Sequence, residues 1–259
     1  MKISKAAFDL IVSEEVSSKQ LYETKYRRPV WPGVSSGATV GIGYDIGHHT
    51  AEQVRADWKG RIPNHMIEAM TRACGITGAA AQNITREIRS SVDIPWEEAL
   101  TVFTNTDIPK WTAIVERELP NTASLSGDSL GALVSLTYNR GPSFSKQGDR
   151  YKEMRSIKAH MQSKNFRKIP AEIRAMKRIW PGVGGLLRRR DREAALFEAG
   201  LSRAPVAETI TTTVVVGGGG VAAKQASDSG ADFVLIGGII LFTVVVAAVV
   251  FTVVRRMKK

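Results

Sequence analysis

A run of 22 residues without charge, Phe233 to Val254, stands near the end of this chain of 259 residues. As an α-helix it would be about 33 Å long at ~1.5 Å per residue. The hydrocarbon core of a bilayer is about 30 Å thick, and the run is too long and too uniformly apolar for an ordinary buried helix. We therefore predict a transmembrane helix over 232–254, in contact with the lipid bilayer through Phe233 to Val254.

The residues on either side of this run complete the predicted organisation. Arg255-Arg-Met-Lys-Lys259 follows it directly, and the segment 202–231, with Gly217 to Gly220 at its centre, has the composition of a flexible linker. By the positive-inside rule the basic end stays in the cytoplasm. The sequence thus predicts a folded domain over 1–201, a linker over 202–231, a membrane span over 232–254 and a basic cytoplasmic tail over 255–259.

The net charge of +11 lies mostly in basic clusters before residue 200. Such a surface suits nucleic acid, anionic lipid or the bacterial cell wall, and a solvated face without a partner explains the charge equally well. The chain has no recognisable nucleic-acid motif, so we predict no nucleic-acid partner. Its single cysteine, Cys74, excludes an intramolecular disulfide and an all-cysteine metal cage. His48 and His49 would point to opposite faces of a strand, and we predict neither a metal nor a cofactor.

The first helix expected from the sequence carries a glutamate on its apolar face. Ser4 suits the N-cap, and Phe8, Ile11 and Glu15 follow at i, i+3 and i+7. Glu14 is rotated by about 100° toward solvent. A carboxyl group held against apolar neighbours has a raised pKa, as a general acid near neutral pH requires. The alternative is that Glu15 only ends the helix at its solvent edge.

Residues 39–45 alternate as a strand does. Thr39 and Asp45 share one face with only glycines between them, while the apolar side chains share the other face. Glycine weakens a strand and often marks the close approach of another backbone or a ligand. We interpret the first face as the floor of a substrate groove; a bulge or tight packing is the alternative.

The chain from Ala51 to about Gly200 is predicted to be mainly helical, interrupted by glycine and proline. Pro95 suits the first turn of a helix. Ser129 to Asn139 is apolar enough for a central helix and is followed by a strong stop at Arg-Gly-Pro. Gly184 to Phe197 is predicted to form the last helix.

Four segments, in matching order, resemble the phage-type lysozymes, the muramidases of tailed-phage endolysins in glycoside hydrolase family 24. They are Glu15 seven residues before Tyr22, the segment Thr39-Val-Gly-Ile-Gly43, the stop Tyr138-Asn-Arg-Gly141, and Gly184 to Phe197. The resemblance covers about residues 1 to 200 and makes 1–201 a catalytic domain. It implies an α+β, lysozyme-like fold, mainly helical with a small β-sheet lobe, to which the transmembrane helix would be added. It also implies cleavage of peptidoglycan between N-acetylmuramic acid and N-acetylglucosamine.

The catalytic set of that family is a glutamate at the end of the first helix, an aspartate or cysteine nine residues later, and a threonine on the strand. Glu15 and Thr39 take the first and third places. Thr24 stands in the second place, so the chain departs from the pattern there. Glu23 or Asp45 could replace the missing carboxylate, and the alternation argument favours Asp45 because it places that side chain beside Thr39.

Three further residues are predicted to contact the substrate. Trp31 stands between two prolines in the loop from Tyr22 to Val34, where its ring is either a platform for a sugar or an anchor on the core. Tyr44 precedes Asp45 on the glycine-rich strand, and Asn139 ends the central helix.

The resulting hypothesis is a phage endolysin that lyses its host. Glu15 would protonate the leaving oxygen, and Asp45, with Thr39 holding a water, would serve the opposite face of the sugar. One alternative is a lytic transglycosylase acting through Glu15 alone; another is an inactive, membrane-tethered protein that binds peptidoglycan. The predicted span places the protein in the host inner membrane, single-pass. The positive-inside rule favours a catalytic domain that faces the periplasm, and the alternative is a domain held on the cytoplasmic face until the membrane is breached. The start of the chain lacks the long apolar core of a signal peptide, and holin-dependent release is one route to the wall.

Overall fold

The computed structural model describes residues 2–205, and most of these are helical. The helices are α1 (Lys5–Val16), α2 (Lys19–Lys25), α3 (Ala51–Trp58), α4 (Asn64–Thr71), α5 (Ala79–Ile88), α6 (Trp96–Val102), α7 (Ile108–Glu118), α8 (Gly127–Arg140), α9 (Lys152–Gln162), α10 (Ile169–Ala175) and α11 (Gly184–Gly200). Two strands, β1 (Thr39–Val40) and β2 (Tyr44–Asp45), form an antiparallel pair.

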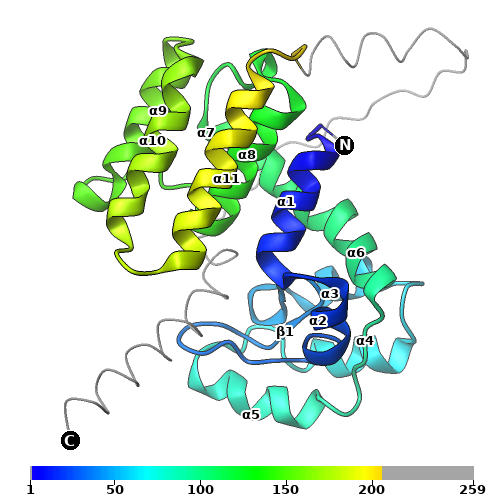
Figure 1. Cartoon of the computed structure of the whole chain (residues 1–259). Coiled ribbons are helices and arrows are strands. Elements are labelled where there is room, and N and C mark those ends of the chain that lie inside the picture. Colours follow the sequence, from blue (N-terminus) through cyan, green and yellow to red (C-terminus); the bar gives the residue numbers. More distant parts are fainter. Residues whose placement is uncertain (1, 206–259) are drawn as a thin grey trace, which may run out of the picture.

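The helices form a small and a large group (Figure 1). The small group contains α2 to α5 and the β1–β2 hairpin, and the large group contains α7 to α11. Helix α1 runs from the large group to the small one, and α6 leads the chain back. Helix α1 packs on both α8 and α11, which pack on each other. The end of α1 therefore lies where the two groups meet.

The predicted α+β fold class is wrong. The sheet of the described residues consists of two strands of two residues each, which is too little to form a β lobe. The segment predicted as one continuous strand turns back on itself, because Gly41 and Gly43 adopt φ values of +59° and +76°. This backbone region is freely open to glycine alone. The glycines thus make a tight hairpin where alternation predicted a strand.

The predicted transmembrane helix, 232–254, lies outside the described residues, as do most of the linker and the basic tail. Within residues 2–205, no helix combines the length and the apolar character needed to cross a membrane.

Three predicted helix features are confirmed. Ser4 is the N-cap of α1, and its hydroxyl accepts a hydrogen bond from the Ala7 amide at 3.1 Å. The central helix is α8, whose residues from Asp128 to Tyr138 are all buried. The last helix begins at Gly184. Apolar periodicity and chain-breaking residues were sufficient to locate these elements.

The α1–α8 contact depends on a helical glycine and provides a test of the packing. A Cβ at Gly131 would overlap the Cβ of Ala7. Gly131→Ala is therefore expected to lower the free energy of unfolding by about 1–3 kcal/mol, as overpacking of a core does. Urea denaturation measures the effect. In the control Gly185→Ala the new methyl meets nothing within 4 Å, and helix propensity predicts unchanged or slightly raised stability. Equal stability of the two variants would contradict the close packing of α1 on α8.

Candidate functional site

Glu15 lies buried in the last turn of α1, with 8% of its surface exposed. Its Oε1 accepts a hydrogen bond from Nη1 of Arg189 on α11 at 2.9 Å. Burial raises the pKa of the Glu15 carboxyl, and the guanidinium of Arg189 offsets part of that rise. The predicted burial of Glu15 is confirmed, but its surroundings are not purely apolar, because its carboxyl group pairs with Arg189. Its neighbour Glu14, expected to face solvent, is also largely covered and pairs with Arg192.

The Glu15–Arg189 pair belongs to a larger buried network on α8 and α11. Arg189 also donates to Glu193 at 3.1 Å and to the carbonyl oxygen of Ser135 at 3.2 Å. The Ser135 hydroxyl donates to Glu193 at 2.7 Å, and Arg190 donates to Glu193 at 2.8 Å and to Oδ1 of Asn139 at 3.1 Å. Together with Glu15 the network holds two carboxylates and two guanidinium groups. Its charges balance, which is the condition under which ionised groups can be buried.

Thr39 and Asp45 are direct partners in the β1–β2 hairpin, paired in register with each other. The prediction that they lie next to each other is confirmed, although its reasoning was wrong, since they face each other across a hairpin and not along one strand. The Thr39 hydroxyl makes a long contact of 3.4 Å with the carbonyl oxygen of Gly37. Thr39 itself is buried, with 4% of its surface exposed.

The Asp45 carboxylate is largely occupied by backbone amides. Its Oδ1 accepts from the amides of Gly37 at 3.1 Å and Gly47 at 3.0 Å, and its Oδ2 lies 3.0 Å from the Gly37 amide and 3.7 Å from Nε2 of His48. Burial raises the pKa of Asp45, while the two amides and His48 lower it. The side chain fixes the two loops around the hairpin. Oδ2 is the oxygen with capacity for a further partner.

Tyr138 on α8 reaches the turn of the hairpin and feels the charge of Glu15 in the buried network. A Cβ at Gly43 would lie 2.6 Å from the Tyr138 hydroxyl, so the absence of a side chain at Gly43 lets this phenol reach the turn of the hairpin. The pKa of Tyr138 is held well above its usual range by burial and by the negative charges of Glu15 and Asp107. Tyr138 therefore stays protonated at neutral pH and offers a hydrogen-bond donor at the boundary between hairpin and network.

The three predicted substrate contacts have different surroundings. Trp31 is half-buried, and its Nε1 donates to the carbonyl oxygen of Ser36 at 3.1 Å, as expected of a loop anchor. Tyr44 is buried, its hydroxyl donates to Asp57 at 2.8 Å and its ring stacks on His49, which leaves no face for a sugar. A packing role therefore replaces the predicted substrate contact of Tyr44. Asn139 is half-buried and joins the network by accepting a hydrogen bond from Arg190.

Sequence reasoning missed Arg189 and Glu193, although their pattern was present. Arg189, Glu193 and Phe197 stand at i, i+4 and i+8, and all three are buried on one face of α11. The run Arg188 to Arg190 was instead interpreted as part of a basic surface. Two charged residues of opposite sign in register with a buried aromatic were the signal that was overlooked.

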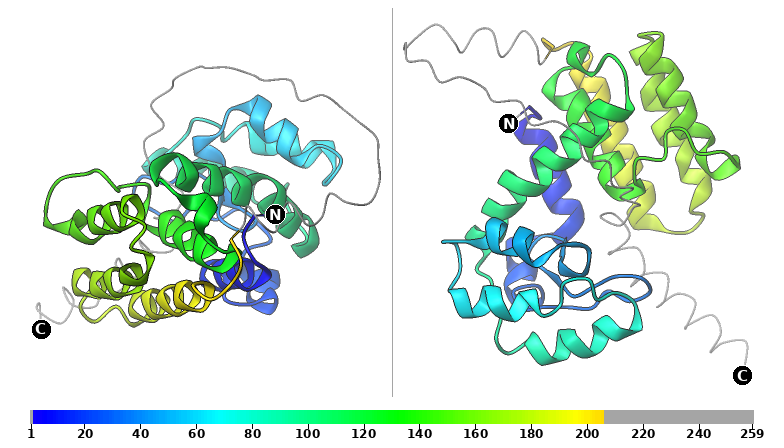
Figure 2. Two further views of the ribbon diagram at one scale, coloured as in Figure 1. Left: turned by 90° about the horizontal axis from the view of Figure 1, so that it is seen from above. Right: turned by 180° about the vertical axis from the view of Figure 1, so that it is seen from behind.

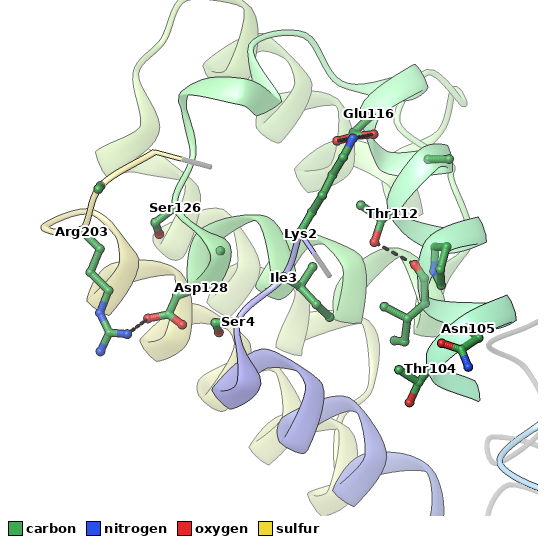
Figure 3. A pocket seen from close by; sticks show the side chains of 15 residues that line it. Lys2, Ile3, Ser4, Thr104, Asn105, Thr112, Glu116, Ser126, Asp128 and Arg203 are labelled. Carbon is green, nitrogen blue, oxygen red and sulfur yellow. Dashed lines mark hydrogen bonds and ion pairs between the residues drawn. The ribbon is translucent and has the colours of Figure 1, made fainter. Parts of the chain in front are cut away.

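The cavities lie away from these residues. A cavity of about 910 Å³ lies at the other end of α1, between the start of the chain, α7 and the start of α8. Figure 3 shows its polar lining, including the Lys2–Glu116 pair and the Asp128–Arg203 pair at 2.7 Å. A second cavity of about 310 Å³ lies beside α2 and includes Glu23, the alternative carboxylate. Glu15, Thr39 and Asp45 line neither. In the part of the chain described, no group of three metal-ligating side chains is arranged for a metal.

Asp107 is a second buried acid near this region. It ends a π-helical segment, Phe103–Asp107, that joins α6 to α7. π-Helical segments are rare in proteins, and those that do occur are often found at functional sites. Burial raises the pKa of Asp107 to about 7, against a smaller opposing effect of Lys110. The folded protein thus keeps a proton on Asp107 where the unfolded chain has lost it.

This shift predicts a pH dependence of stability. Below about pH 4 both states are protonated at Asp107; as the pH rises toward 7, only the unfolded state ionises, so the free energy of unfolding falls. A raised pKa of about 7 against 3.8 corresponds to a loss on the order of 4 kcal/mol. Asp107→Asn should remove this part of the slope. Urea denaturation of the wild type and the variant between pH 4 and pH 8 measures the free energy of unfolding of each. The same dependence on pH in both proteins would refute the raised pKa of Asp107.

Comparison with known proteins gives a match to one family model, described as a domain of unknown function (DUF8812), over residues 12–116. The matched region contains Glu15, Thr39 and Asp45 and ends in α7, so it excludes α8 and α11 with the partners of Glu15. No curated protein matches the chain.

Proposed function

We propose that this protein is a peptidoglycan hydrolase that cleaves the glycan bond between N-acetylmuramic acid and N-acetylglucosamine, with Glu15 as the general acid. The observation that carries the proposal is the buried carboxyl of Glu15 with its raised pKa, held by Arg189. The negative charge of Glu15 acts on Tyr138, whose hydroxyl reaches the turn of the hairpin that holds the buried hydroxyl of Thr39 and the buried carboxylate of Asp45. An acid and a carboxylate on opposite sides of a bond are the two groups that glycoside hydrolysis requires.

Each group then has a defined task. Glu15 donates its proton to the leaving oxygen and becomes a carboxylate, and the guanidinium of Arg189 at 2.9 Å stabilises the charge that develops. Thr39 holds the attacking water through its weakly engaged hydroxyl. Asp45 accepts the proton of that water through Oδ2. Its carboxylate is kept in place by the Gly37 and Gly47 amides.

One observation favours a second function, that of a lytic transglycosylase acting through Glu15 alone. Both oxygens of Asp45 already accept hydrogen bonds from backbone amides, which fits a purely structural carboxylate. The chain would then lack a second catalytic acid. In a transglycosylase the sugar's own hydroxyl replaces the attacking water.

Mass spectrometry of the products separates these functions. The purified full chain is incubated with peptidoglycan sacculi, and the soluble fragments are analysed. Hydrolysis yields reducing-end N-acetylmuramic acid, and transglycosylation yields 1,6-anhydro ends. Sacculi that bind the protein but release no fragments would refute both enzymatic functions and leave a wall-binding protein. A role in phage lysis at the host inner membrane concerns residues outside those described and stays a prediction.

A further inference from the structure

The loop after α8 and the adjoining face of α9 carry basic side chains without acidic partners. We define the basic surface as Lys146, Arg150, Arg155 and Lys158. None of the four forms an ion pair within residues 2–205; Arg155 donates to loop carbonyl oxygens and Lys158 to the Ser145 hydroxyl. The two acids nearest in sequence, Asp149 and Glu153, are both taken by Arg178. The surface therefore has a net positive charge that the protein itself does not neutralise.

Aromatic rings support two of these cations, Lys146 and Arg150, and also the neighbouring buried Arg140. Arg140 lies over the rings of Trp180 and Tyr151, at 5.0 and 5.7 Å from their centroids. Lys146 lies 5.7 Å from the Tyr151 centroid, and Arg150 lies 6.0 Å from that of Trp180. Contacts of this kind orient a cation without neutralising it. Side chains already held in position lose less entropy when an anion binds.

The buried guanidinium of Arg140 adds to the positive electrostatic potential of the basic surface. Arg140 is 9% exposed, its Nη2 donates to the carbonyl oxygen of Arg150 at 2.8 Å, and its Nε has no hydrogen-bond partner. The pKa of Arg140 is lowered to about 10 by burial and by the neighbouring charges of Arg150 and Arg178. An external anion would relieve this repulsion.

Buried side chains connect the aromatic support of the basic surface with the candidate site. Arg189 contacts Glu15, whereas the next residue, Arg190, contacts Asn139 and lies 5.8 Å from the Trp180 centroid. Two adjacent side chains of α11 thus join the buried acid to the aromatic support of the basic surface. Helices α9 and α10 lie at the outer edge of the large group (Figure 2).

The observations favour one class of anion. A lipid surface is disfavoured because the large exposed apolar side chains of the described residues, Val34 and Leu201, lie outside this surface. Guanidinium groups fixed on aromatic rings suit planar carboxylates, which they can bind in a bidentate manner. We propose that the basic surface binds the carboxylates of the peptide stems on the glycan strand that the site cleaves. This inference rests on the proposed function for the identity of the substrate.

Binding to sacculi tests the proposal in the full chain, with Glu15→Gln as the background so that no substrate is consumed. Lys146→Gln together with Arg150→Gln is expected to weaken cosedimentation with sacculi about tenfold, since two exposed charge contacts of up to ~1 kcal/mol each are lost. The matched control is Lys164→Gln with Arg167→Gln, which removes the same charge from exposed positions. The control is expected to bind like the parent. Equal weakening of both pairs would refute a localised site.

The identity of the ligand is tested with sacculi whose chemistry has been altered. Sacculi whose carboxyl groups have been converted to amides should bind the parent and the Lys146/Arg150 variant equally. A variant that binds these amidated sacculi less well than the parent would overturn the proposal. A second variant, Arg155→Gln with Lys158→Gln, keeps the test valid if the first unfolds. A short duplex DNA is the remaining probe: loss of DNA binding with unchanged binding to sacculi would identify the surface as a nucleic-acid site instead.

The binding assay and the product analysis can distinguish failure of the carboxylate site from failure of the proposed reaction. If no fragments are released in the product analysis but the basic surface still governs binding to sacculi, the proposed reaction fails and the carboxylate site survives. If fragments are released and the Lys146/Arg150 variant keeps its KM on sacculi, the reaction survives and the carboxylate site fails.

Discussion

Replacement of Glu15 by glutamine is expected to lower the rate of peptidoglycan cleavage by about 10²–10⁴. Glutamine has nearly the shape of glutamate and can still accept a hydrogen bond from Arg189, but it has no proton of suitable acidity to give to the leaving oxygen. The loss should therefore appear in kcat, with KM little changed. Release of soluble fragments from sacculi, followed under saturating substrate, measures it.

Glu14→Gln is the matched control, since it makes the same chemical change one residue earlier in α1. Its largely covered side chain pairs with Arg192, which is half-exposed, and not with the buried network. We expect this variant to keep the rate within a few-fold of wild type. A Glu15→Gln protein that is folded by circular dichroism and retains full activity would end the assignment of Glu15 as the acid.

The pH profile gives an independent check on Glu15. Because burial raises its pKa, the reactive protonated form persists to higher pH than it would for an exposed glutamate. The activity of the wild type should fall on the alkaline side as Glu15 ionises. The residual activity of the glutamine variant should lack that alkaline limb.

Arg189→Met is expected to produce the largest loss of stability among single substitutions at the site. Arg189 is buried and serves Glu15, Glu193 and the Ser135 carbonyl, so its removal leaves two carboxylates with only Arg190 to compensate them. Breaking a buried ion pair from one side costs about 3–5 kcal/mol. Urea denaturation at pH 7 measures the change in the free energy of unfolding.

The charges also predict how the destabilisation caused by Arg189→Met depends on pH. Without Arg189 the pKa of Glu15 should rise further, because the guanidinium now lowers it. The destabilisation should therefore shrink at low pH, where Glu15 is protonated. Arg188→Met provides the control, since that side chain is exposed on the same helix; we expect a change within about 0.5 kcal/mol. Similar losses for both variants would show that the buried network contributes little.

Particular residues show how far the sequence alone can be taken. Glu15 was found because a helical period of 3.6 places it on the stripe of Phe8 and Ile11, and burial then follows from packing. The pairing of Thr39 with Asp45 was reached by the wrong geometry, because alternation along a strand ignores that glycine at φ > 0 turns the chain. Local pattern therefore identified candidate side chains more reliably than it did the backbone that carries them.

Local sequence pattern could not predict the partners of Glu15, for a different reason. Arg189 lies 174 residues away in sequence, and a contact over that separation depends on how α1, α8 and α11 pack. Charge composition alone favoured solvent exposure for the run Arg188 to Arg190, as it does for most arginines. The family match over 12–116 includes the carboxylates and the hairpin but stops before this helix.

The pairing of the first helix with the last has a consequence for synthesis of the chain. A ribosome makes Glu15 near the start and Arg189 only after most of the described domain has been translated. Until α11 has left the exit tunnel, the nascent chain has no partner for this acid and no complete site. The proposed site around Glu15 is therefore complete only after the last helix has been made.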